Sequence, residues 1–263
     1  MLVTKGVLPN VKRIDVLLRP CLFYYHPNFF EEMSSAHGHQ LECMVLLSEF
    51  SETEDELPYN LFSWLVSLFP NLKVFSMEVD FFDNDNGTWL PARRFRQPLA
   101  WRHLNEISIF CDIGDMGNDL AAATGNLKFL HIEISNLSGE NLQAILVANP
   151  GLQELRVRDV HGLLHDDEQI IGNYGKNLLH IECINFRKLD DGNLVDLVGE
   201  DSKLCRLEVD DDVQLTVAGF RRLFVEKDLQ LLGKGDGYIL VGDNGTMGSL
   251  KSAFPDRNWR CCN

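Results

Sequence analysis

The feature that most constrains this chain is an apolar motif, L-x-x-L-x-L, that returns at a nearly constant spacing. Five clear copies begin 23, 25, 26 and 26 residues apart. Their first, fourth and sixth residues are Leu104-Ile107-Ile109, Leu127-Leu130-Ile132, Leu152-Leu155-Val157, Leu178-Ile181-Cys183 and Leu204-Leu207-Val209. Looser copies precede them, and a degenerate one follows near Leu229; the looser copies are Val11-Ile14-Val16, Leu41-Met44-Leu46 and Leu72-Phe75-Met77. Periods of this size indicate stacked repeats, because a single unit cannot bury its own apolar face.

Each motif copy predicts a short strand followed by a helix. Alternate side chains of a strand point to opposite faces, so the fourth and sixth residues go into the core together. Between two copies, Leu142, Ile145 and Leu146 have helical spacing. Ser138 stands where an N-cap residue is expected, and Asn149-Pro150-Gly151 ends the helix because proline cannot continue it. The same pattern predicts helices within Phe186 to Val198 and Val213 to Phe224.

The segment NLSGENLQAILVANPGLQEL, from Asn136 to Leu155, resembles the repeat of F-box/LRR proteins and of the ribonuclease-inhibitor-like superfamily. Asn136 holds the corner after the strand, and Pro70-Asn71-Leu72 and Pro150-Gly151-Leu152 match the exit from the helix. Most copies depart from that repeat by lacking its corner cysteine; Val160 and Phe186 stand near the corner instead. The resemblance spans roughly residues 8–232. It implies an α/β leucine-rich repeat solenoid, or horseshoe, with parallel strands on the concave face and helices on the convex face.

The domain organisation follows from the same pattern. Residues 1–232 are expected to form one repeat domain, with irregular repeats over 8–103 and regular ones over 104–232. Phe82 to Pro98 is too polar for a convex helix and predicts a surface loop. The glycine-rich segment 233–263 is expected to be a C-terminal cap or tail, or to contain a small hairpin around Asp243-Asn244-Gly245.

The resemblance also implies a function, since members of that group often serve as substrate receptors of cullin-type ubiquitin ligases. In such receptors the repeats hold the substrate and a separate N-terminal F-box docks on the ligase. The stretch Leu57 to Leu65 superficially resembles the opening of an F-box. The strand expected at Leu72 leaves room for one helix, however, so we interpret the stretch as the helix of its own repeat. An alternative is an F-box-free repeat protein that acts as an inhibitor or assembly factor. Because the repeats begin almost directly, at Leu8, three origins stay open: a fragment of a longer F-box protein, a truncated isoform or a stand-alone protein.

The net charge and the spacing of the cysteines indicate which classes of partner and which compartment to expect. The formal net charge is −15 and the pI about 4.9. Phosphate groups of nucleic acids and anionic membranes need a basic face, so neither is expected as a partner. A basic protein partner fits the charge, although acidity also serves solubility. The seven cysteines lack the spacing of a zinc site or a disulfide framework, residues 1–20 lack a signal peptide's apolar run, and no run is long enough to span a membrane. These features predict a cytoplasmic or nuclear protein.

Candidate catalytic and metal motifs are weak. His161 and His165 have the spacing of a metal pair on a helix, but Gly162 stands where a metalloprotease glutamate would be, and the stretch through Glu168 is expected on a loop. Asp83 to Gly87 resembles a calcium loop in the wrong register, and Gly233 to Gly237 lacks the Lys-Ser/Thr of a phosphate loop. The sequence contains no G-x-S-x-G motif. We therefore expect neither an enzyme nor a bound metal or cofactor.

The strand residues between the leucines are the candidate binding site. The third, fifth and seventh positions of the motif are expected on the concave, solvent-facing side. They include aromatic and arginine side chains, which are frequent hot spots of protein interfaces. The alternative is that these side chains merely pair across strands, for example Arg156 with Glu133 or Glu182. The candidate residues are Glu106, Phe110, Phe129, His131, Glu133, Glu154, Arg156, Arg158, His180, Glu182, Arg206 and Glu208.

Overall fold

The chain has an α/β architecture in which strands and helices alternate. The computed structural model describes residues 10–18, 28–48, 61–78, 101–110, 116–135, 137–160, 167–184, 189–200, 202–209, 216, 218–219, 222–223, 229–234, 237–240 and 258–261. The strands are β1 (Arg13–Leu18), β2 (Cys43–Ser48), β3 (Val74–Glu78), β4 (Glu106–Phe110), β5 (Phe129–Ser135), β6 (Glu154–Val160), β7 (His180–Ile184), β8 (Arg206–Val209), β9 (Leu231–Lys234), β10 (Gly237–Leu240) and β11 (Asn258–Cys261). The helices are α2 (Phe29–His37), α3 (Leu61–Leu68), α4 (Gly117–Ala123), α5 (Gly139–Ala148), α6 (Asp167–Tyr174) and α7 (Asp191–Val198).

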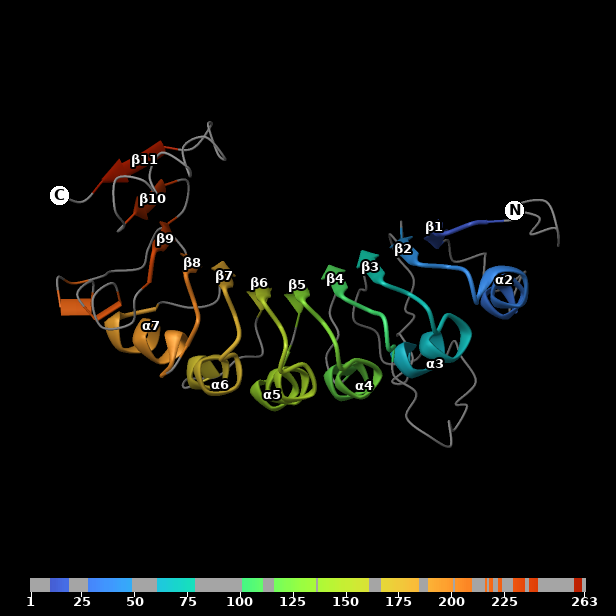
Figure 1. The fold of residues 1–263 in the computed structure, drawn as a ribbon, viewed down its shortest axis with the longest axis horizontal. Helices are drawn as coiled ribbons and strands as arrows, with labels where there is room; N and C mark the ends of the chain where they lie inside the picture. Colours follow the sequence, from blue (N-terminus) through green and yellow to red (C-terminus); the bar gives the residue numbers. More distant parts are fainter. Residues whose placement is uncertain are drawn as a thin grey trace.

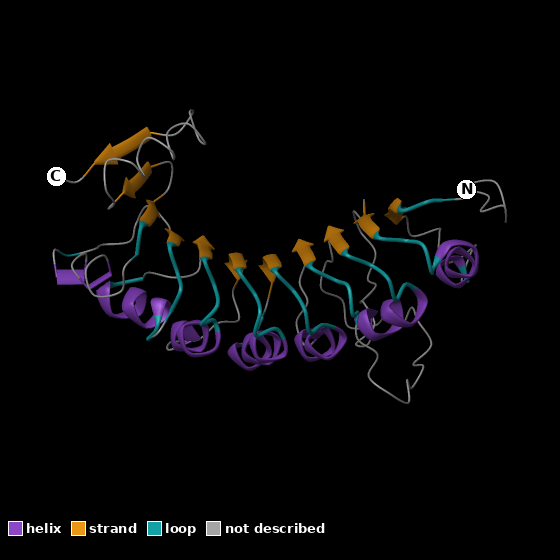
Figure 2. Cartoon of the chain, in the orientation of Figure 1, coloured by secondary structure: helices purple, strands orange, loops and turns teal. Residues whose placement is uncertain are grey.

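The strands form one sheet whose order follows the sequence from β1 to β11. Neighbours from β1 to β9 pair in parallel, β10 runs antiparallel to β9, and β11 runs parallel to β10. The strands β1 to β9 follow the inner side of an arc, and the helices lie along its outer side (Figure 1). Figure 2 shows the same separation, with strands in orange and helices in purple. The described helices therefore cover one face of the sheet, as the repeat pattern predicts.

The register aligns the motif copies. The fourth motif residues form one continuous buried row, each beside its counterpart on the next strand: Ile14, Met44, Phe75, Ile107, Leu130, Leu155, Ile181, Leu207 and Leu232. The looser N-terminal copies and the degenerate copy at Leu229 are thus confirmed as strands of the same sheet. The predicted core position of Cys183 is also confirmed, because its side chain is fully buried.

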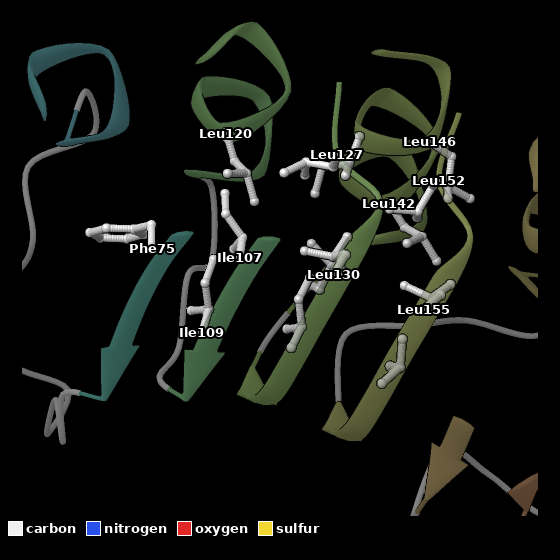
Figure 3. Packing of buried hydrophobic residues seen from close by; sticks show 14 of the residues in the cluster. Phe75, Ile107, Ile109, Leu120, Leu127, Leu130, Leu142, Leu146, Leu152 and Leu155 are labelled. Carbon is white, nitrogen blue, oxygen red and sulfur yellow. The ribbon is translucent and has the colours of Figure 1, made fainter. Parts of the chain in front are cut away.

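The core lies between the sheet and the helices. Strand residues such as Ile107 and Leu130 meet helix residues such as Leu120 and Leu142 in this layer (Figure 3). Burying one such aliphatic side chain contributes about 1.5–3 kcal/mol. Towards the N-terminus the same layer contains larger aromatic side chains. Trp101 stacks on Phe75 with ring centroids 5.8 Å apart, and its indole N–H donates to the Phe69 carbonyl at 2.8 Å.

The predicted helix boundaries are partly right. The Ser138 side chain accepts from the backbone N–H of Asn141, which confirms it as the N-cap of α5. The helix α3 confirms that the stretch around Leu61 is helical. The helix expected from Phe186 begins only at Asp191, because Asp190 caps it through the N–H groups of Gly192 and Asn193.

Other expectations concern residues that have a different secondary structure or that lie outside the described residues. Asp167 and Glu168 begin α6, so the loop expected through Glu168 ends earlier, where the helical run of the repeat starts. A small hairpin is one alternative around 243–245; among the described strands, the antiparallel pair is formed earlier in the chain, by β9 and β10. Several expectations concern segments that lie outside the described residues. These are the loop at 82–98, the calcium-like stretch at 83–87, the corner residue Asn136, both histidines 161 and 165, the turn at 243–245 and most of 213–224. Among the described helices, none has the length and apolar character needed to cross a bilayer.

Candidate functional site

The face of the sheet opposite the helices, here called the strand face, carries the candidate residues. It consists of the third, fifth and seventh motif positions on β4 to β8. Pairing aligns them in three rows across neighbouring strands. The rows are Glu106–Phe129–Glu154–His180–Arg206, Ser108–His131–Arg156–Glu182–Glu208 and Phe110–Glu133–Arg158–Ile184. The parallel register therefore brings all the predicted site residues onto one surface.

A network of ion pairs occupies the strand face over β6 to β8. Glu182 accepts from Arg158 Nε at 2.6 Å and lies 3.5 Å from Arg156 Nε. Arg156 Nε also donates to Glu154 Oε1 at 2.6 Å. The expected cross-strand pairing of Arg156 with Glu182 is confirmed. These residues thus stabilise one another as well as forming the surface.

The network is more deeply buried than the sequence predicts. The side chains of His180 and Glu182 are only 11% and 5% exposed, although strand alternation predicts that both face solvent. Neighbouring strands lie about 4.8 Å apart, so long side chains in adjacent rows lie over one another. Arg156 and Arg158 contact the carboxylate of Glu182 in this way and cover it. His180 and Glu182 therefore support the surface more than they present a contact.

Glu208 is the most strongly perturbed group of the network. Burial alone would raise its pKa. The ring N–H of His180, 3.1 Å from Glu208 Oε1, and the adjacent Arg206 guanidinium outweigh burial and lower the pKa to about 2. Glu208 is consequently a carboxylate at any physiological pH.

His180, Glu182 and Glu208 also have the ligand types of a metal site. One ligand atom of each lies within 4.8 Å of the others. However, Glu182 already pairs with Arg158 and Glu208 with Arg206, so a divalent cation would have to displace guanidinium groups and would be repelled by them. The geometry therefore favours a closed ion-pair network over a metal centre.

A hollow of about 310 Å³ opens on the strand face over β4 to β6. Phe129 stands at this hollow with 41% of its surface exposed. Ser108 also lines it; a serine gives no chemical signal in the sequence, and only its register position could have identified it. The lining residues are Glu106, Ile107, Ser108, Phe129, Leu130, His131, Glu154 and Arg156.

His131 forms one wall of the hollow. Its ring meets the Phe110 ring edge-on, with centroids 4.8 Å apart. Its Nε2 atom is 3.3 Å from Glu133 Oε2, but the geometry is not that of a hydrogen bond, and among the described residues this buried nitrogen has no hydrogen-bond partner. Burial lowers the pKa of His131, with Glu133 opposing and Arg156 adding to the shift. The ring is therefore neutral at neutral pH.

Comparison with known proteins adds no assignment. No model of a protein family matches the chain, and no curated protein matches it. The surface must therefore be interpreted from its own geometry: an exposed aromatic ring beside a hollow, next to a charged network that is internally paired.

Proposed function

We propose that this chain is a leucine-rich repeat horseshoe of the F-box/LRR type whose strand face binds another protein. The observation that carries the proposal is Phe129, a ring that is 41% exposed at the hollow, on a face where the charged side chains of β6 to β8 pair with one another. The core does not require an aromatic side chain at an outward position, whereas aromatic residues contribute strongly to protein interfaces.

A binding role fits this surface better than catalysis. On the strand face, the described charged side chains of β6 to β8 pair with one another, and none of these described residues is a base beside a nucleophile. The rows extend over five strands, a width of about 20 Å at the usual strand spacing. A surface of this width suits a macromolecule. The net charge of −15 favours a basic protein over nucleic acid.

The resemblance of the repeats leads to a more specific proposal, that the chain is the substrate-recognition region of a cullin-type ubiquitin ligase receptor in the cytoplasm or nucleus. Affinity purification of the natural full-length protein tests this part. Co-purification of ligase components would support it. A stable partner without any ligase component would instead support an inhibitor or assembly factor.

Site-specific photo-crosslinking tests the binding surface itself. A benzophenone amino acid is introduced at Phe129, which conserves an aromatic side chain, and in a second variant at Val147 on α5. Val147 is 56% exposed and lies on the helix side, so it is a matched control. We expect a protein crosslinked in cells from position 129 and absent from position 147. Equal crosslinking from both positions, or crosslinking from 147 alone, would contradict the proposed surface.

A further inference from the structure

We propose that the hollow over β4 to β6 receives a single cationic side chain, a lysine or an arginine, of the bound protein. This inference rests on the proposed function and names the chemistry of the partner. Its occupant is identified by three properties of the hollow: the position of Phe129 between two glutamates, the charge of the lining and the size of the hollow.

The arrangement follows from the strand register. Glu106 on β4, Phe129 on β5 and Glu154 on β6 are direct neighbours in one row. Phe129 therefore has a glutamate beside it on each neighbouring strand; Glu154 is paired with Arg156, whereas Glu106 is exposed. The face of an aromatic ring attracts cations through its quadrupole, and flanking carboxylates add to this attraction. Lysine and arginine match such a row, whereas an acidic side chain would be repelled by it.

The charge of the lining also favours a cation. Glu106 is exposed and forms no ion pair with any described residue. Arg156, the one cation among the lining residues, is already held by Glu154 and Glu182. Burial of His131 lowers its pKa and so disfavours a positive charge there. The hollow thus retains an unbalanced negative charge at Glu106, beside the exposed ring.

The size of the hollow fits one long side chain. Its volume of about 310 Å³ is at the lower end of the roughly 300–1,000 Å³ typical of small-molecule pockets. Ile107 and Leu130 also line it, but their side chains are buried in the core on the other side of the sheet, so they contribute backbone to the hollow. Lysine and arginine commonly lay their aliphatic stems on apolar surface and keep the charged end in a polar environment. In this hollow the stem would contact the Phe129 ring and the charged end would reach Glu106.

Titration of the isotope-labelled full chain with short peptides, followed by NMR, tests the inference. The probes are acetyl-Gly-Lys-Gly-amide, acetyl-Gly-Arg-Gly-amide and, as the matched control, acetyl-Gly-Glu-Gly-amide. We expect saturable shifts at the amides around Phe129 with the lysine or arginine peptide and none with the glutamate peptide. Glu106→Gln and Phe129→Ala should each weaken binding about threefold to fivefold, while Val147→Ala should not change it. Both site residues lie at the surface, and unchanged thermal unfolding confirms that the variants fold.

Two results would overturn the inference: equal or stronger binding of the glutamate peptide, and no saturable shift with any peptide up to its solubility limit. These outcomes are separable from failure of the proposed function. If crosslinking at position 129 still captures a protein, the strand face binds a partner, and only the cationic occupant of the hollow is wrong.

Discussion

At the scale of single residues, Asp119 shows how one side chain joins two repeats. It belongs to α4, yet its carboxylate accepts from the backbone N–H groups of Phe62 at 2.8 Å and Ser63 at 3.2 Å, and from the Ser63 hydroxyl. The first N–H groups of a helix have no partner within it, so α3 depends on a residue of its neighbour. Burial raises the pKa of Asp119, and the hydrogen bonds from Ser63 and Phe62 oppose that shift.

Replacing Asp119 should therefore destabilise the fold. Asp119→Ala leaves two N–H groups of α3 without an acceptor, and we expect a loss of about 1–3 kcal/mol in the free energy of unfolding. Asp119→Asn keeps one acceptor oxygen and should lose less. Urea denaturation followed by circular dichroism measures both variants. Wild-type stability in the alanine variant would show that water replaces the carboxylate at no cost.

Glu208 predicts a dependence of stability on pH. Its pKa in the folded chain, about 2, lies below the ordinary value of 4.5, so the unfolded chain binds the proton more tightly. The contribution of Glu208 is therefore fully present above pH 4.5 and is lost as the pH falls towards 2. Glu208→Gln should be less stable than the wild type at pH 6, on the order of 2 kcal/mol, and the difference should shrink below pH 4. Glu140→Gln, at an exposed position of α5, is the control. A difference that stays constant with pH would contradict the assignment.

At the scale of elements, α6 and α7 approach each other through two glycines. A Cβ at Gly172 would lie 2.0 Å from the Asp196 carbonyl oxygen and 3.0 Å from Gly199 Cα. Gly199, directly after α7, has a φ of 72°, a conformation that other residues adopt at a cost. The helix spacing here thus depends on the absence of side chains.

Gly172→Ala should force the two helices apart and destabilise the chain by about 1–3 kcal/mol, the usual cost of overpacking. Gly125→Ala is the matched control, because a Cβ there would meet its nearest neighbour, the Ala148 carbonyl oxygen, at 3.9 Å. Thermal unfolding measures the melting temperatures of both variants. Equal melting temperatures for the two variants would mean that α6 can shift freely.

Elements differ in how far the sequence predicts them. The strands were predictable because their inward residues repeat at fixed positions, and the register of Leu130 with Leu155 follows directly. Helix starts were predictable where a cap and helical spacing coincide, as at Ser138, but not at α4, whose apolar residues are mostly small alanines. The surface rows were predictable from register. The burial of Glu182 and the hollow beside Phe129 were not, because both depend on how large side chains of neighbouring strands lie over each other.

At the scale of the whole molecule, the principal contacts join each strand to the next strand and each helix to the next helix. Each strand from β1 to β8 packs against the next strand, and α4 packs on α5 and α6 on α7. The buried apolar residues nevertheless form one cluster, from Ile14 on β1 to Leu232 on β9. In such a linear arrangement, stability is approximately the sum of the repeats and of the interfaces between neighbours. Destabilising one repeat should therefore destabilise its neighbours, and the loss of stability should decrease with distance along the sheet.

Leu155→Ala tests this view of the whole chain. Leu155 is fully buried in β6, in the middle of the inward row, so its truncation should cost about 2–5 kcal/mol. Hydrogen–deuterium exchange with mass spectrometry should show the largest loss of protection in β5, β6 and β7 and the smallest in β1 and β2. Val147→Ala, on the exposed side of α5, should leave the profile unchanged. An equal loss of protection from β1 to β9 would mean that the sheet unfolds as a single cooperative unit, in spite of its nearest-neighbour contacts.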